Sequence, residues 1–479
     1  MLLKNKQFIF ILLTICVSLA LIMPSIVQQG MFMDGIQYAV VSKNLAIGKG
    51  TFWLPFLCDS WNRHGVNYFL EHPPLVYFLQ SYFFKFFGDA YYTEKIYSVF
   101  TFIVCAILIN KIWVHLFKNE PELIKYSWLP ILIWLIIPSV HWAFVNNMHE
   151  NTVSVFVLGS ILFSLKAINN FKLYDIIISG ILIFCATLCK GLPGLYPLLF
   201  FVIYAFCYKN TSIKSVITYT FILIATLILI YTIIILLNNE ALFSLKFYIQ
   251  NRLFDRLTND HLVEYRFSII FWLFTDLLVP FMLVILLLFI FKLKIFLNLE
   301  TITYKNDILF FVLLGLAGVI PLAFTHVQRA VYFVPALPLF AIAISLFLVN
   351  GINNLINKIN INSKLYINSN YFICILCIGL ISYNIFLVGK IERDGVEINE
   401  ANLISKVVLS DATLIVEPET YTNWALQFYL LRNHNITINC NKGSSNYFLY
   451  KKNSLFDSTI KVSKLNLNST IYSLYKKSN

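Results

Sequence analysis

The sequence predicts an all-α polytopic membrane protein that ends in a small α/β domain. Of the 479 residues, 59% are hydrophobic and only 13% are charged, which is more apolar surface than a soluble protein of this length could bury. Apolar runs of about 20 residues, the length that crosses a bilayer, recur as far as residue 389. The segment after residue 389 is polar and contains the strand-like stretches "ATLIVEP" and "NYFLYKK".

The apolar runs give about 11 predicted transmembrane helices. They cover residues 8–27, 94–117, 127–145, 151–168, 175–190, 193–208, 215–237, 268–291, 308–325, 330–350 and 369–389. The first run follows Lys4 and Lys6 as in a signal peptide, but it is long and no small-x-small cleavage site ends it. We therefore expect an uncleaved first span that also targets the chain.

Lysine placement predicts the orientation. The formal net charge is +12, which in a membrane protein indicates topology, so we expect no nucleic-acid partner. With the N-terminus in the cytoplasm, every short cytoplasmic loop carries lysine: Lys118 and Lys125, Lys166 and Lys172, Lys209 and Lys214, Lys292, Lys294 and Lys305, and Lys358 and Lys364. An odd number of spans then places the segment after residue 389 on the outer, periplasmic face of the inner membrane. The predicted domains are 1–389 and 390–479.

The first long outer loop, residues 28–93, predicts two helices that lie in the membrane interface. In "MFMDGIQYAVVSKNLAIGKG", apolar residues at helical spacing follow Asp34, and Gly48 and Gly50 end the helix. The second stretch is "YFLEHPPLVYFLQSYFFKFFG". Proline holds the preceding residue extended and suits a first helical turn, so a helix should begin near Pro74 and end at Gly88.

The outer loops mix acids, histidines and arginines, unlike the lysine-bearing cytoplasmic loops. Such a mixture is typical of an active site, in which acids serve as bases or metal ligands and cations bind a phosphate. The candidates are Asp34, Glu71, His72, Glu150, Arg252, Arg256, His261, Arg329 and Tyr332. Taken alone, Asp34 is better explained as a helix cap, and Glu71 and His72 as a capping acid and an interfacial histidine.

Four stretches together resemble a known family. They are "MDGIQYAVVSKNLAIGKG", "FLEHPPLVYFLQSYFFKFFG", "CKGLPGLYPLLF" and "QRAVYFVPALPLF". Their order and spacing over residues 1–350 resemble the GT-C membrane glycosyltransferases, in the bacterial branch of lipid A aminoarabinose transferases and protein mannosyltransferase-like enzymes. The resemblance implies a GT-C-like transmembrane catalytic domain that takes a sugar from a polyprenyl-phosphate carrier.

The resemblance also implies roles for matching residues. Asp34 matches the catalytic aspartate, and Tyr38 an aromatic residue that commonly follows it. Glu71 matches an acid that can bind a divalent metal, and Glu150 a second acid. His72 stands where many relatives have lysine near the donor phosphate. The first motif often reads Asp-Glu, whereas here Gly35 follows Asp34.

Later positions complete the implied site. Arg329 and Tyr332 match the basic and tyrosine positions of an Arg-x-x-Tyr-x-x-Pro-type motif. Arg252 and Arg256 are further cations for a phosphate. The histidine expected as a metal partner in the third loop has no secure counterpart, and His261 is the best local candidate.

The function expected from sequence is sugar transfer from a polyprenyl-phosphate carrier in the bilayer to a cell-surface acceptor. The acceptor atom is a hydroxyl or phosphate of lipid A, of another glycan or of a protein. Asp34 would act as general base, with inversion at the anomeric carbon. The alternatives are a metal-independent polyprenyl-linked glycan ligase and a membrane transporter. We expect the C-terminal domain to shape acceptor access.

If Asp34 is the base, Asp34→Asn keeps the side chain's size but removes its ability to accept a proton. General-base assistance is worth about 10²–10⁴-fold, so turnover per folded molecule should fall at least about 10²-fold while donor binding changes little. Turnover is measured with a polyprenyl-linked sugar and the native acceptor. Retention of more than about a tenth of wild-type turnover would exclude Asp34 as the base.

Overall fold

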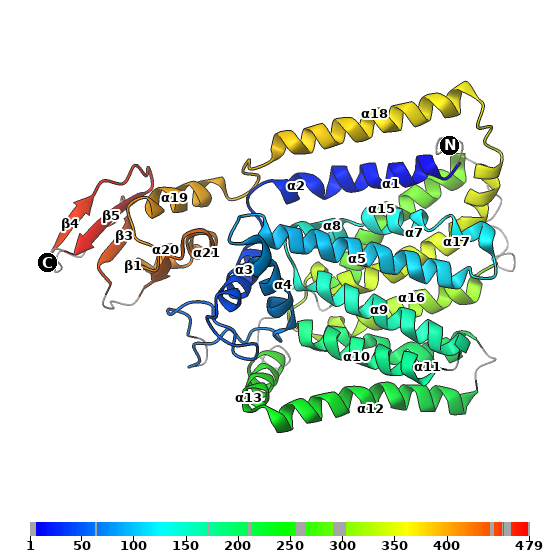
Figure 1. Cartoon of the computed structure of the whole chain (residues 1–479), viewed down its shortest axis with the longest axis horizontal. Coiled ribbons are helices and arrows are strands. Elements are labelled where there is room, and N and C mark those ends of the chain that lie inside the picture. Colours follow the sequence, from blue (N-terminus) through cyan, green and yellow to red (C-terminus); the bar gives the residue numbers. More distant parts are fainter. Residues whose placement is uncertain are drawn as a thin grey trace. The chain divides into compact units, whose positions relative to one another are not determined.

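The structure is a computed structural model that describes residues 6–62, 65–170, 172–208, 212–254, 265, 267–290, 303–440, 445–452, 454 and 461–477. The chain forms two compact units, each built from separate stretches of sequence. Unit 1 consists of Met1–Pro24, Glu71–Leu75 and Ser98–Leu387. Unit 2 consists of Ser25–Leu70, Val76–Tyr97 and Val388–Asn479, so most of the first predicted outer loop packs with the C-terminal segment. Figure 1 labels the elements of both units along the chain.

Unit 1 contains the long apolar helices. Its elements are α1 (Phe8–Leu21), most of α5 (Thr93–Leu116), α6 (Pro121–Ile124), α7 (Trp128–Leu135), α8 (Pro138–Val145), α9 (His149–Asn170), α10 (Leu173–Lys190), η2 (Leu192–Gly194), η3 (Tyr196–Leu199), α11 (Phe200–Cys207), α12 (Ile213–Leu237), α13 (Asn239–Tyr248), η4 (Ile249–Phe254), α15 (Ser268–Ile290), α16 (Lys305–Val319), η7 (Ile320–Phe324), η8 (Ala330–Ala336), α17 (Leu337–Asn357) and α18 (Lys364–Leu387). α10 packs between α9 and α12, and α1 lies beside α18 (Figure 1).

Burial identifies the centre of unit 1. In the span Ala330–Lys358, which contains α17, 89% of the apolar window is buried, whereas the corresponding share is 11% in α12 and 17% in α18. α16 and α7 pack directly against α17. α17 therefore forms the core of the bundle, and the apolar exposed sides of α12 and α18 are suited to lipid.

The described residues contain eight helices long and apolar enough to cross a membrane, or nine if one bent pair counts as a single span. The about 11 predicted runs correspond to these eight helices, the bent pair and two shorter apolar helices in the described part of the chain. The runs at 8–27 and 193–208 form only shorter apolar helices, Phe8–Leu21 and Leu192–Cys207. Prolines account for the shortness of both helices. Pro24 follows the break between α1 and α2, and Pro193 and Pro197 lie in the 3₁₀ turns η2 and η3.

The bent pair is α7 and α8, which meet at 79° around Pro138. The backbone N–H of Ser139, in the first turn of α8, donates to Oδ2 of Asp276 on α15 at 3.3 Å. Asp276 is buried, and burial of an acid inside a span is costly unless it is hydrogen-bonded. Its observed partner is the amino end of a half-helix, where a carboxylate is favoured.

Unit 2 combines helices with a mixed sheet. Its elements are most of α2 (Met23–Val27), α3 (Met33–Ala46), α4 (Leu75–Phe87), α19 (Gly395–Ser405), β1 (Thr413–Val416), α20 (Pro418–Tyr421), α21 (Trp424–His434), β2 (Thr437–Asn439), β3 (Tyr447–Lys451), β4 (Val462–Leu465) and β5 (Tyr472–Lys477). The strand order is β2-β1-β3-β5-β4. β1 pairs in parallel with β2 and β3, while β5 pairs antiparallel with β3 and β4.

The helices predicted in the first loop are confirmed as α3 and α4. Gly48 and Gly88 follow them with φ of +81° and +72°, the left-handed conformation that favours glycine. The strands predicted in "ATLIVEP" and "NYFLYKK" are confirmed as β1 and β3. The functional domain boundary near residue 389 and the periplasmic orientation stay predictions.

Gly30 permits the close approach of two segments of unit 2. The N–H of Gln29 donates to the carbonyl of Lys390 at 2.7 Å, and the N–H of Glu392 donates back to the carbonyl of Gln29 at 3.1 Å. Gly30 has φ of +95°, and a Cβ there would lie 2.5 Å from the carbonyl oxygen of Arg393. A side chain at this position would push the segments apart.

Gly30→Ala should therefore destabilise unit 2 more than Gly48→Ala. Both positions have positive φ, which costs a non-glycine residue about 1–2 kcal/mol. Only position 30 adds a collision, because a Cβ at Gly48 would meet nothing within 4 Å. We expect an extra loss of about 1–3 kcal/mol at position 30, measured as thermal unfolding in detergent by circular dichroism. Equal unfolding temperatures for the two variants would contradict the predicted collision.

Candidate active site

The two units divide the candidate residues. Unit 1 contains Glu71, His72, Glu150, Arg252, Arg329 and Tyr332, and unit 2 contains Asp34 and Tyr38. Arg256 and His261 lie outside the described residues.

A buried ion pair joins the start of α9 to the end of α10. The ammonium of Lys190 donates to Oε1 of Glu150, and the two side chains are only 6% and 1% exposed. Glu150 lies in the first turn of α9 and Lys190 in the last turn of α10, so each charge also opposes the partial charge of its own helix end. Oε2 of Glu150 is buried and has no hydrogen-bond partner among the described side chains and backbone.

The residues after Lys190 fix its surroundings. Gly191 has φ of +75°, and a Cβ there would collide with the hydroxyl of Tyr248. That hydroxyl donates to the carbonyl oxygen of Lys190 at 3.3 Å. The Lys190 ammonium lies 5.0 Å from the ring centroid of Tyr332, within range of a cation–π interaction. Tyr332 of the predicted Arg-x-x-Tyr motif thus contacts Lys190.

A second buried ion pair links Glu71 to Arg252. The side chains are 9% and 13% exposed, and the guanidinium of Arg252, on the π-helical turn η4, contacts Oε2 of Glu71. His72, the next residue, is also buried, and its ring lies 5.2 Å from that of His149 in an edge-on arrangement. Two residues that sequence analysis assigned to different roles, metal ligand and phosphate-binding cation, therefore face each other.

Several of these residues line a cavity of about 80 Å³. Its lining consists of His72, Lys190, Leu192, Pro193, Tyr248, Arg252, Leu253, Leu322, Thr325, Val327 and Tyr332. Among the described residues, both cations line the cavity, whereas their partners Glu71 and Glu150 do not. Lys190 and Arg252 thus border the cavity, and the carboxylates that contact them are not part of its lining. Apolar neighbours strengthen such charges by excluding water.

The described residues do not form a metal site. No group of three or more His, Cys, Asp or Glu side chains that could hold an ion occurs in the described part of the chain. Glu71 pairs with Arg252, which competes with a metal for its carboxylate. His261 falls outside the described residues, so the divalent metal stays a prediction.

In unit 2, Asp34 lies half-buried in the first turn of α3. The N-cap residue of this helix is Phe32, which makes no side-chain cap, so Asp34 does not occupy the N-cap position that the capping alternative requires. Tyr38 is buried one turn further on, and its ring centroid lies 6.1 Å from that of Tyr77 on α4. The catalytic role of Asp34 stays a prediction.

Sequence reasoning did not assign Lys190 or Tyr248 to the site. The sequence contained a signal that could have indicated Lys190 as a site residue, because Lys190 precedes "GLPG" in one of the family-like stretches. Tyr248 had none, because its position depends on how η4 and α13 pack against the turn at Gly191. Arg329 begins the 3₁₀ turn η8 with an exposed side chain. Its predicted phosphate-binding role stays untested.

Comparisons with known proteins agree with this fold. Residues 71–235 match the family described as dolichyl-phosphate-mannose-protein mannosyltransferase. ArnT from Cupriavidus metallidurans bound to undecaprenyl phosphate is similar at a TM-score of 0.67 and 12% identity, over 97% of each chain. Its apo state is similar at a TM-score of 0.62 and 11% identity, again over 97% of each chain. No curated protein matches the sequence. The chain has the GT-C fold, and the matched family and this fold together indicate a membrane glycosyltransferase.

The Lys190–Glu150 pair predicts strong coupling between two substitutions. Glu150→Gln alone leaves a buried ammonium without its counter-charge, and Lys190→Met alone leaves a buried carboxylate. Each should cost about 3–5 kcal/mol of stability, whereas the double variant should cost clearly less than the sum. The coupling energy from thermal unfolding of the four proteins should be at least about 1 kcal/mol. Additive losses would contradict a direct pair.

Proposed function

We propose that the protein transfers a sugar from a polyprenyl-phosphate carrier to a hydroxyl or phosphate of a cell-surface acceptor. The acceptor is lipid A, another glycan or a protein, and the reaction takes place at the outer face of the inner membrane. The observation that carries the proposal is the cavity of unit 1, whose lining includes Lys190 and Arg252 but not Glu71 and Glu150. The binding of undecaprenyl phosphate by the similar ArnT supports the choice of donor.

The cavity suits the phosphate of such a donor. Arginine offers several N–H donors in a fixed plane and binds phosphate with two parallel hydrogen bonds, and lysine adds a compact charge. His72, also on the cavity, supplies a third group that can donate to a phosphate oxygen. The apolar side chains of Leu192, Pro193 and Leu322 offer a surface for the first isoprenoid carbons.

The same cations would accelerate the reaction. Breaking the glycosidic bond transfers negative charge to the departing phosphate. Lys190 and Arg252 are already oriented by their carboxylates, so they stabilise this charge without rearrangement in a poorly hydrated cavity. Asp34, by family resemblance, is the proposed base that accepts the proton of the acceptor hydroxyl, which favours inversion.

The alternative of a transporter has less support. Transporters place unpaired or ion-binding charges within their spans. Asp276, a buried acid within α15, accepts a hydrogen bond from the amino end of α8 and so has a structural explanation. A metal-independent polyprenyl-linked ligase would use the same cavity, and it differs from the proposal in the size of the glycan transferred.

The proposal predicts that Arg252→Gln weakens the binding of undecaprenyl phosphate. Loss of one charge-assisted contact costs about 1.5–3 kcal/mol, so the Kd should rise about 10- to 100-fold. Arg393→Gln is the matched control, because Arg393 lies in unit 2 with a 45% exposed side chain beside Asp394. Binding is measured by native mass spectrometry on the detergent-solubilised protein, with the folded fraction checked by gel filtration.

The test of the activity itself is transfer of labelled sugar from the carrier to lipid A, surface glycan or protein in membranes of a deletion strain. We expect label in one acceptor class with the wild-type protein and much less label with Arg252→Gln at the same donor concentration. Unchanged affinity of Arg252→Gln for undecaprenyl phosphate would contradict the assignment of the cavity. Transfer of a preassembled long glycan would favour the ligase.

A further inference from the structure

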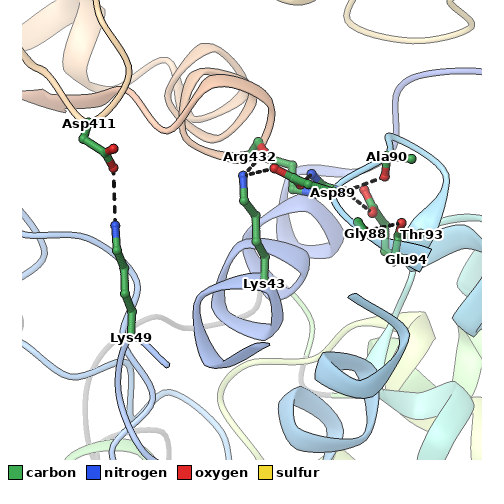
Figure 2. A network of polar contacts seen from close by, with 9 residues as sticks. All are labelled: Lys43, Lys49, Gly88, Asp89, Ala90, Thr93, Glu94, Asp411 and Arg432. Atoms are coloured by element: carbon green, nitrogen blue, oxygen red, sulfur yellow. Dashed lines mark hydrogen bonds and ion pairs between the residues drawn. The ribbon is translucent and has the colours of Figure 1, made fainter. Parts of the chain in front are cut away.

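Helix α21 of the C-terminal segment places an arginine in the interior of unit 2. The Arg432 side chain is 1% exposed, although it belongs to a segment expected to form a separate polar domain. It makes an ion pair with Asp89 and another with Glu94 at 2.7 Å, and it donates to the carbonyl of Ala90 at 2.8 Å. Figure 2 shows these contacts converging on the turn that precedes α5.

Lys43 connects the same network to α3. Its ammonium donates to the backbone carbonyl of Arg432 at 2.8 Å and pairs with Asp89 at 2.6 Å (Figure 2). The Lys43 side chain is 5% exposed. Burial lowers the pKa of this ammonium, and the facing Asp89 carboxylate opposes the shift. The two cations, Lys43 and Arg432, balance the two acids, Asp89 and Glu94, so removal of any one of the four leaves an unbalanced charge.

A second residue of α21 contacts the other end of α3. The hydroxyl of Tyr429 accepts from the backbone N–H of Met31 at 3.2 Å and donates to Oδ2 of Asp394 at 3.0 Å. Tyr429 is buried, and Met31 stands immediately before Phe32, the N-cap of α3. α21 therefore contacts both the segment leading into α3 and, through Lys43, its last turn. Between these contacts lie Asp34 and Tyr38.

We propose that α21 is a positioning element of the active site, in which Tyr429 and Arg432 hold α3 so that Asp34 is correctly oriented. This inference rests on the proposed function, because it takes Asp34 as the base. It gives the C-terminal segment a role in turnover that goes beyond shaping access for an acceptor. Neither Tyr429 nor Arg432 is assigned to contact substrate.

A second, exposed ion pair provides a control for this network. Lys49, just after α3, pairs with Asp411 of the C-terminal segment at 3.4 Å (Figure 2). This pair joins the same two stretches of chain, but its side chains are 49% and 67% exposed. Exposed pairs contribute little because water screens them. Asp411→Asn should therefore leave α3 unaffected.

The experiment compares full-length wild-type protein with Arg432→Lys, Tyr429→Phe and Asp411→Asn in detergent or nanodiscs. Arg432→Lys keeps the charge but cannot reach both acids and the carbonyl. Tyr429→Phe removes a single hydroxyl, so it is informative even if Arg432→Lys fails to fold. Three quantities are measured: hydrogen exchange of amides in α3, kcat for sugar transfer, and the Kd for undecaprenyl phosphate.

We expect exchange in α3 to rise at least about fivefold in Arg432→Lys and Tyr429→Phe, while exchange in α9 and α17 stays unchanged. The kcat should fall about tenfold or more, because small displacements of a reacting group are costly, and the Kd should stay within about twofold. Asp411→Asn should match the wild type in all three measurements.

Two results would overturn the proposal: unchanged exchange and kcat in both folded variants, or a rise in exchange that spreads equally to α9 and α17. The second result would mean general destabilisation. A wild-type protein that transfers no sugar would refute the proposed function, and the exchange measurement would still decide whether α21 holds α3.

Discussion

The structure depends on the pairing of charges that an apolar chain has buried. A lone buried ion loses its hydration at a cost of several kcal/mol, and only a close counter-ion with good hydrogen bonds offsets that cost. Lys190 meets Glu150, and Arg252 meets Glu71, inside unit 1. Arg432 meets its acids inside unit 2. The segments that carry these partners have to come together for either unit to fold, so the pairs fix which distant stretches of sequence become neighbours.

The sequence distances spanned by these pairs explain why the compact units are discontinuous. Lys190 and Glu150 are 40 residues apart, whereas Arg432 and Glu94 are 338 apart. The second pair ties the C-terminal segment to the first loop, and the same connection is made by backbone hydrogen bonds between Gln29 and residues 390–392. A C-terminal segment bound in this way is part of the unit that contains Asp34, which a reading of the chain as consecutive domains does not reveal.

Local sequence patterns predicted the helices and strands well, but they predicted poorly which helices and side chains contact one another. Hydropathy located the apolar helices, and the glycines and prolines of the first loop placed the ends of α3 and α4. The same reasoning missed the break of 79° at Pro138 and the shortening of two spans, because proline's effect depends on which neighbours satisfy the freed backbone groups. Sequence reasoning named Glu71 and Arg252 as site residues but could not predict their ion pair, because no pattern in either stretch indicates the other as its partner.

The ion pair with Arg252 gives Glu71, the acid that precedes Pro73 and Pro74, a physical role other than that of a metal ligand. An acid facing a phosphate directly would repel it, so a carboxylate in a phosphate site needs an intervening cation. A metal is one such cation, and an arginine held by the acid is another. Pro73 and Pro74 stiffen the chain at Glu71, and a fixed carboxylate restricts the guanidinium that binds it. The entropy of ordering Arg252 is then lost during folding, and under the proposed function the charge on the cavity would be preorganised for the donor phosphate.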